Sequence, residues 1–101
     1  TSYGCAIKNN GNSIYMMGTT TAKYLVERVS ITLYLQKWDG SKWVDVRAYH
    51  NSNTKAKSIT AGDDTYTFER GNYYRTRGVH YVKDGTETEY RYSVSSYIYV
   101  K

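Results

Sequence analysis

Apolar and polar residues alternate one by one along several stretches of this chain, and no stretch sustains a helical period. The alternation is clearest at residues 29–35 and 88–100, and shorter examples occur at 12–18 and 44–48. Successive side chains of a β-strand point to opposite faces, so a period of two is typical of half-buried strands. The pattern therefore predicts an all-β protein.

The first turn signal is Asn10-Gly11, which favours a two-residue hairpin loop. This loop would place Ile7 opposite Ile14 and Cys5 opposite Met16. Paired residues share a face of the sheet, and these four apolar residues do so. The turn and the alternation therefore predict the same hairpin.

A second hairpin is predicted around the turn at residues 39–42. Its register places Trp38 opposite Trp43 and Tyr34 opposite Arg47. These four side chains share the face that the aliphatic residues of the hairpin do not occupy. We therefore expect them to point to solvent.

A third hairpin is predicted around residues 83–85, with Gly85 at the left-handed position of a three-residue loop. This register places Gly78 opposite Tyr90 and turns the apolar side of residues 88–100 inward. It also places Arg77 opposite Arg91, which is an unfavourable cross-strand pair of like charges.

Residues 55–61 and 64–69 read as two further short strands, the first of them an edge strand guarded by Lys55 and Lys57. About seven short strands in 101 residues predict an antiparallel two-sheet β-sandwich of the immunoglobulin-like type. A small β-barrel is the second choice. The length suits one domain spanning residues 1–101.

A resemblance to a known family rests on residues 26–37 (VERVSITLYLQK), residues 71–81 (GNYYRTRGVHY) and Trp43. These segments resemble small exported proteins of Gram-positive bacteria, most of which have no assigned function. The resemblance implies an immunoglobulin- or fibronectin-III-like sandwich and export from the cell. In such sandwiches a corner tyrosine follows a turn like that at 71–72, and Tyr74, on the inward face, suits this structural role better than Tyr73.

The chain opens at Thr1 without an initiator Met, as a trimmed mature protein or an excised segment would, and we expect a secreted, extracellular protein. No apolar stretch approaches the ~20 residues of a membrane-spanning helix, so we expect no transmembrane segment. The net charge of +5 favours anionic partners, although it is also common in small soluble proteins.

No residue pattern indicates catalysis, a metal or a cofactor. We expect His80 to be partly buried with its hydrogen bonds satisfied, His50 to be solvated and Cys5 to be a buried, inert thiol beside Met16. Asp63-Asp64 could offer oxygen ligands to calcium, but two adjacent acids in a turn are more typical of a loop. We therefore expect a protein that is not an enzyme and carries no cofactor.

An aromatic platform on the second hairpin is the main candidate for a binding site. It contains large flat side chains with polar groups among them, on which sugar rings or bases can stack. The alternative is that Trp38 and Trp43 only stabilise the hairpin as a cross-strand pair. The candidate ligand-binding residues are Tyr34, Trp38, Trp43, Arg47 and Tyr49.

A second stripe mixes basic and aromatic residues, and its members are Tyr73, Arg75, Arg77, Val79, Tyr81 and Lys83. The predicted register puts Glu87 and Glu89 beside this stripe, which disfavours nucleic acid as a partner.

The first hypothesis is therefore a binding module for a carbohydrate or cell-surface polymer. The alternative is a small secreted effector (a toxin, antimicrobial or inhibitor) that binds a protein or an anionic membrane through Arg75, Arg77 and Lys83. The oligomeric state stays open.

Overall fold

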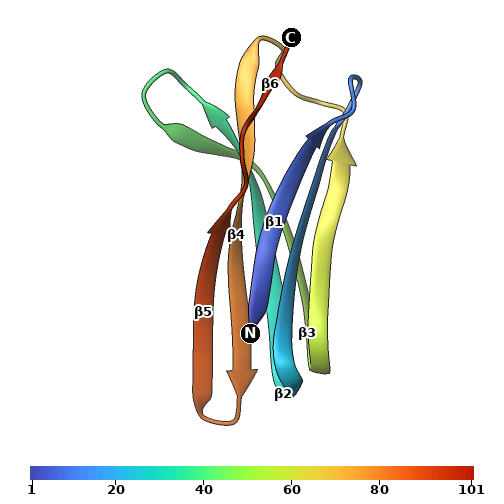
Figure 1. Ribbon diagram of the computed structural model, residues 1–101, viewed down its shortest axis with the longest axis vertical. Coiled ribbons are helices and arrows are strands. Elements are labelled where there is room, and N and C mark those ends of the chain that lie inside the picture. Colours follow the sequence, from blue (N-terminus) through green and yellow to red (C-terminus); the bar gives the residue numbers. More distant parts are fainter.

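The computed structural model describes residues 1–101, and 79% of them lie in strands, with no helix. One antiparallel sheet contains all six strands and curls into a half-barrel (Figure 1). The all-β prediction is confirmed, and the curled sheet corresponds to the second choice, a small barrel, because no separate second sheet forms. The strands are β1 (Ser2–Asn9), β2 (Ile14–Trp38), β3 (Trp43–Thr65), β4 (Asn72–Asp84), β5 (Glu87–Val94) and β6 (Ile98–Val100).

β2 and β3 form one long hairpin that folds back on itself. The register shifts between Thr21 and Val26, where four residues of β2 lie opposite a single residue of β3. Beyond this bend the two halves of β2 face each other, since the Thr20 hydroxyl donates a 3.0 Å hydrogen bond to the carbonyl of Ser30. The predicted strands at 12–18 and 29–35 are therefore the two halves of one bent strand. Those at 44–48 and 55–61 likewise belong to β3.

The central path of the sheet runs β1-β2-β4-β5, while β3 pairs with β2 and β6 pairs with β4. β3 pairs with β2 alone and carries exposed Lys55 and Lys57, which confirms the predicted lysine-guarded edge. The curl brings β1 towards β4 and β5, where the Thr76 hydroxyl donates to the carbonyl of Ala6 at 3.4 Å. Residues 66–69, predicted as part of a strand, lie in the link after β3.

The interior of the half-barrel contains two apolar clusters separated by polar residues. The larger cluster is Ile14, Met16, Leu33, Leu35, Tyr74 and Val100, and the smaller one is Ala22, Val26, Val29 and Val82. Along β4, the inward positions between them are Thr76, Gly78 and His80. Burial of the two clusters supplies the main driving force for folding, and the polar residues between them must be satisfied by hydrogen bonds.

The first hairpin closes with a longer turn than the sequence predicts. Ile7 pairs with Met16, so the register is shifted by two residues from the predicted Ile7–Ile14 pair. The turn closes through a 2.9 Å hydrogen bond from the Asn10 amide to the Ser13 carbonyl. A shift of two keeps every side chain on its face, and Ile14 and Met16 are buried as predicted.

The register predicted for the β4–β5 hairpin is wrong. Asp84 pairs with Glu87, leaving a two-residue loop, and Tyr81 pairs with Tyr90. This differs from the predicted register by three residues, and an odd shift moves every side chain to the other face. Tyr90 and Tyr92 are therefore exposed on the outer face, and the predicted contact between like charges at Arg77 and Arg91 does not form.

Tyr74 has the structural role that the sequence predicts. Its ring is buried in the larger cluster, and its hydroxyl exchanges two hydrogen bonds of 2.9 Å with the backbone NH and carbonyl of Glu69. These bonds hold the link between β3 and β4 against the end of the half-barrel.

The structure has no long apolar helix that could cross a bilayer.

Candidate aromatic binding site

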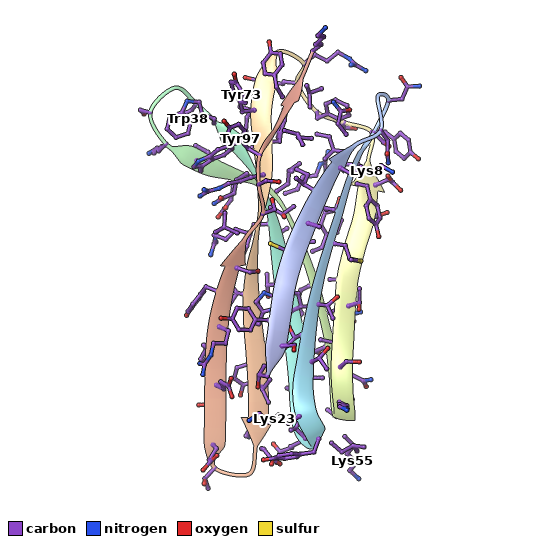
Figure 2. All side chains as sticks on the ribbon, in the orientation of Figure 1. Lys8, Lys23, Trp38, Lys55, Tyr73 and Tyr97 are labelled. Atoms are coloured by element: carbon purple, nitrogen blue, oxygen red, sulfur yellow. The ribbon has the colours of Figure 1, made fainter.

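Four aromatic side chains converge on the outer face, near the end of the sheet where the β2–β3 turn projects (Figure 2). They come from four different segments: β2, β3, β4 and the link between β5 and β6. Together they form the whole lining of an open cavity of about 260 Å³, which we call the aromatic cup. Its members are Trp38, Trp43, Tyr73 and Tyr97.

The β2–β3 turn and the pairing of β2 with β4 position these rings. The carboxylate of Asp39 accepts hydrogen bonds of 2.9 Å from the amides of Ser41 and Lys42, which closes the turn with Trp38 opposite Trp43. These bonds lower the pKa of Asp39 below its ordinary value, because they favour the charged carboxylate. The predicted tryptophan pair is confirmed.

The rings touch in tilted and edge-on arrangements. The centroids of Trp38 and Trp43 lie 5.4 Å apart, and Tyr97 contacts Trp43 at 6.4 Å and Tyr73 at 5.5 Å. Such pairs stabilise one another by about 0.5–1.5 kcal/mol. The tryptophans are half-buried, whereas Tyr73 is 43% and Tyr97 63% exposed, so the cup remains open to solvent.

A row of polar side chains runs beside the cup on the same face, which we call the outer network. Gln36 donates to the Asp45 carboxylate at 2.8 Å and accepts a 2.8 Å hydrogen bond from Nε of Arg75. Arg77 forms an ion pair with the other oxygen of Asp45 at 3.4 Å. The single carboxylate of this network is therefore shared between Gln36 and Arg77.

Arg75 joins the outer network to the cup. Its guanidinium lies 4.5 Å from the ring centroid of Trp43, within cation–π distance. It takes part in none of the four ion pairs of the structure, and its only side-chain hydrogen bond is the one to Gln36. Partial burial, and secondly the charge of Arg77, lower the pKa of Arg75.

The structure separates the five residues of the predicted platform. Trp38 and Trp43 lie in the cup, and Tyr34 lies on the same face under the guanidinium of Arg77, 4.3 Å from its ring centroid. A β-bulge at Val46 makes Arg47 pair with Leu35 and Tyr49 pair with Leu33. This one-residue insertion turns both side chains to the opposite face from the cup.

Tyr49 and Arg47 consequently have other contacts. Tyr49 packs against the larger apolar cluster, and Arg47 donates a 3.3 Å hydrogen bond to the carbonyl of Thr67. The sequence could not place Tyr73 and Tyr97 in the cup, or Arg75 beside it, because no local turn encodes the pairing of β2 with β4 that brings these residues to the tryptophans.

The second predicted stripe does lie along the outer face of β4, but most of its charge is neutralised. Lys83 pairs with Glu27 at 3.1 Å and Arg77 pairs with Asp45. Glu87 and Glu89 lie opposite Asp84 and Val82, and not opposite Tyr81 and Val79 as predicted. Tyr81 instead stacks on Tyr90, with 4.9 Å between ring centroids.

His80 is buried inside the half-barrel at the centre of a second group of hydrogen bonds, which we call the inner network. Thr20 Oγ1 lies 2.8 Å from Nδ1 and Ser93 Oγ lies 2.6 Å from Nε2. Because the Thr20 hydroxyl donates its proton to Ser30, it accepts from Nδ1–H. The prediction that the hydrogen bonds of His80 are satisfied is confirmed, and the ring is fully rather than partly buried, which lowers its pKa.

The side chains of Cys5 and Asp64, two other candidates from the sequence, make contacts within the fold. Cys5 pairs with Gly18, not Met16, is half-buried, and lies 3.3 Å from Ser93 Oγ. The carboxylate of Asp64 accepts hydrogen bonds from Asn10 and Ser13, which hold the first hairpin turn. No cluster of three or more His, Cys, Asp or Glu side chains is arranged to hold a metal ion.

The largest cavity, about 570 Å³, lies near the bend of β2 and the β4–β5 turn. Its lining mixes acidic, basic and apolar side chains, without a convergent set of donors or stacked rings. The aromatic cup is smaller but has a uniform aromatic lining beside an unpaired guanidinium, so it is the better candidate for a binding site.

No protein-family model, curated protein or solved structure matches this chain. The resemblance to exported sandwich proteins therefore stays a prediction. The features of the chain that bear on its function are the aromatic cup and Arg75 beside it.

Proposed function

We propose that this protein is a secreted, non-enzymatic binding module that recognises a carbohydrate of a cell surface or of the environment through the aromatic cup. The observation that supports this proposal is the convergence of four aromatic rings from four separate segments around one open cavity. A cross-strand tryptophan pair alone would stabilise the hairpin without Tyr73 and Tyr97 completing a concave surface.

Sugar rings suit such a cavity because their faces carry apolar C–H groups and their edges carry hydroxyls. The apolar faces stack on Trp and Tyr rings, while polar neighbours fix the hydroxyls. Beside the cup, the terminal nitrogens of Arg75 are donors that no other group of the protein occupies. An aromatic surface and free hydrogen-bond donors on one face support the proposal.

The test is binding of a polysaccharide panel by the wild-type protein and by Trp38→Ala and Trp43→Ala. We expect either substitution to weaken binding at least tenfold, because each removes one wall of the cup. Tyr66→Ala is the matched control, since Tyr66 is 74% exposed and contacts no other ring. Unchanged binding in both tryptophan variants, with folding intact, would refute the proposal.

A small secreted effector that binds an anionic membrane or a protein is the second candidate. It is favoured by exposed apolar and tyrosine side chains further along the same outer face, at Tyr90, Tyr92 and Val94. This candidate predicts binding to vesicles of anionic lipid that is reduced by salt and by substitution of Arg75, Arg77 and Lys83. If vesicle binding is unaffected by salt and by these three substitutions, the membrane-binding effector is excluded.

A further inference from the structure

We propose that the ligand of the aromatic cup is an acidic polysaccharide, one of whose sugar rings stacks in the cup while its carboxylate or sulfate group binds Arg75. The inference rests on the proposed function, because it names the chemical class of sugar that the same site takes. Three properties of Arg75 support it: the fixed position of the guanidinium, its free donors and its electrostatic surroundings.

The position of Arg75 is set from two sides. Gln36 accepts the Nε proton at 2.8 Å, and the Trp43 ring lies 4.5 Å from the guanidinium carbon. The guanidinium is therefore held in one place at the wall of the cup, and less side-chain entropy is lost when a ligand binds.

The donors of Arg75 are not consumed inside the protein. Nε is occupied by Gln36, whereas the two terminal nitrogens form no hydrogen bond or ion pair with any side chain or carbonyl. The nearby carboxylate of Asp45 is already engaged by Gln36 and Arg77. A planar pair of N–H donors matches the two oxygens of a carboxylate or sulfate group.

The charge around the site favours an anion. Asp45 is the only carboxylate of the outer network and pairs with Arg77, whereas Arg75 has no carboxylate partner and lies near the positive charge of Arg77. A bound anion would relieve this repulsion. The net charge of +5 adds a longer-range attraction for a polyanion.

An acidic sugar fits these observations better than a nucleic acid or a membrane does. Both of the latter present a dense array of phosphates and are bound by several unpaired cations in a row. Here Arg77 and Lys83 are already paired with carboxylates, which leaves Arg75 as the one free cation of the stripe. One free guanidinium beside a concave aromatic surface matches a ligand with one charge per stacked ring.

The experiment compares ligands that differ only in charge. Wild-type protein is titrated with tetragalacturonate and with its methyl ester, and separately with dextran sulfate and dextran, by following tryptophan fluorescence. We expect an acidic member to bind at least tenfold more tightly than its neutral partner, which corresponds to about 1.4 kcal/mol. The pair that shows the difference distinguishes carboxylate from sulfate recognition, and this comparison needs no variant.

The variants then locate the effect. Arg75→Gln should abolish the difference in affinity between the acidic ligand and its neutral partner, and should lower the affinity for the acidic ligand much more than that for the neutral one. Arg91→Gln is the matched control, because Arg91 is exposed, pairs with Glu89 and lies outside the cup. Trp43→Ala should weaken acidic and neutral ligands alike.

The outcomes separate the inference from the function on which it rests. Equal affinity for acidic and neutral partners, with both lost in Trp43→Ala, would overturn the acidic-sugar inference and leave carbohydrate binding standing. No binding of any sugar would overturn both. Tighter binding of oligothymidylate or anionic vesicles than of the acidic sugars would also overturn the inference.

Discussion

The two polar networks of this protein, one inside the half-barrel and one on its outer face, differ in whether their hydrogen-bonding groups are all satisfied. The inner network around His80 satisfies both ring nitrogens, and no buried side-chain nitrogen or oxygen in the structure lacks a partner. The outer network leaves the terminal nitrogens of Arg75 free beside the aromatic cup. A complete network inside the fold serves stability, whereas an incomplete one on the surface can bind a ligand.

The largest effect on stability should come from a substitution that fills the space occupied by the inner network. A Cβ atom at Gly78 would lie 2.7 Å from Ser93 Oγ and 2.8 Å from His80 Nε2. We expect Gly78→Ala to lower the free energy of unfolding by about 3 kcal/mol, through overpacking and the loss of a buried hydrogen bond. Chemical denaturation measures this change.

A change below 1 kcal/mol in Gly78→Ala would show that the inner network can rearrange, and would weaken the contrast with the outer one. Gly4→Ala is the control, because a Cβ atom there meets nothing within 4 Å.

A smaller effect should appear in the pH dependence of stability. Burial holds the pKa of His80 below its ordinary value of 6.5, so the unfolded chain takes up a proton that the folded protein does not. Stability should therefore be complete above about pH 6.5 and should decrease as the pH falls below that value. Urea denaturation at a series of pH values measures the slope.

His80→Gln should remove this slope between pH 7 and pH 5. It should also cost about 1–3 kcal/mol at pH 7, because Thr20 and Ser93 lose their shared partner. A slope that persists in the variant would assign the pH dependence to other groups.

The aromatic cup should contribute less to stability than the inner network does. Trp43→Ala removes the stacking with Trp38 and Tyr97 and the cation–π contact with Arg75, and we expect a loss of about 1–2 kcal/mol. Thermal unfolding measures it, and the same sample serves for ligand titration. A loss as large as that of Gly78→Ala would mean that the cup is mainly a structural element.

The smallest effect on stability should come from the outer network itself. Asp45→Asn breaks the partly exposed pair with Arg77, which should change stability by less than about 1 kcal/mol. It should also free Arg77, so that an acidic polysaccharide binds more tightly and with a steeper dependence on salt. Weaker binding of the acidic ligand would show that Asp45 is needed to position Arg75 through Gln36.

The sequence predicted those features that depend on local periodicity. Alternation placed Ile14, Met16, Leu33 and Leu35 on the buried face, and it did so correctly even though the first hairpin register was displaced by two residues. An even displacement does not change which side chains face inward. The tryptophan pair was likewise predictable, because only the four-residue turn at 39–42 separates Trp38 from Trp43 in the sequence.

Two errors, in the predicted platform and in the third hairpin, have the same physical cause, which is an odd displacement between paired strands. A single extra residue at Val46 moved Arg47 and Tyr49 out of the predicted platform. A two-residue loop in place of a three-residue one moved Tyr90 and Tyr92 to the outer face. Neither segment contains a residue type that signals the displacement. Val46 continues the alternation of apolar and polar residues, and Gly85 suits hairpin loops of several lengths.

By itself, the sequence determined the all-β class, the buried face of the long hairpin and the burial of Tyr74 and His80, because these follow from side-chain period and turn chemistry. Only the tertiary structure decided the composition of the aromatic cup. Tyr73, Arg75 and Tyr97 reach the tryptophan pair because β4 pairs with β2 along one edge, while β5 and then β6 pair with β4 along the other edge. That choice depends on packing between segments distant in sequence, which no local pattern records.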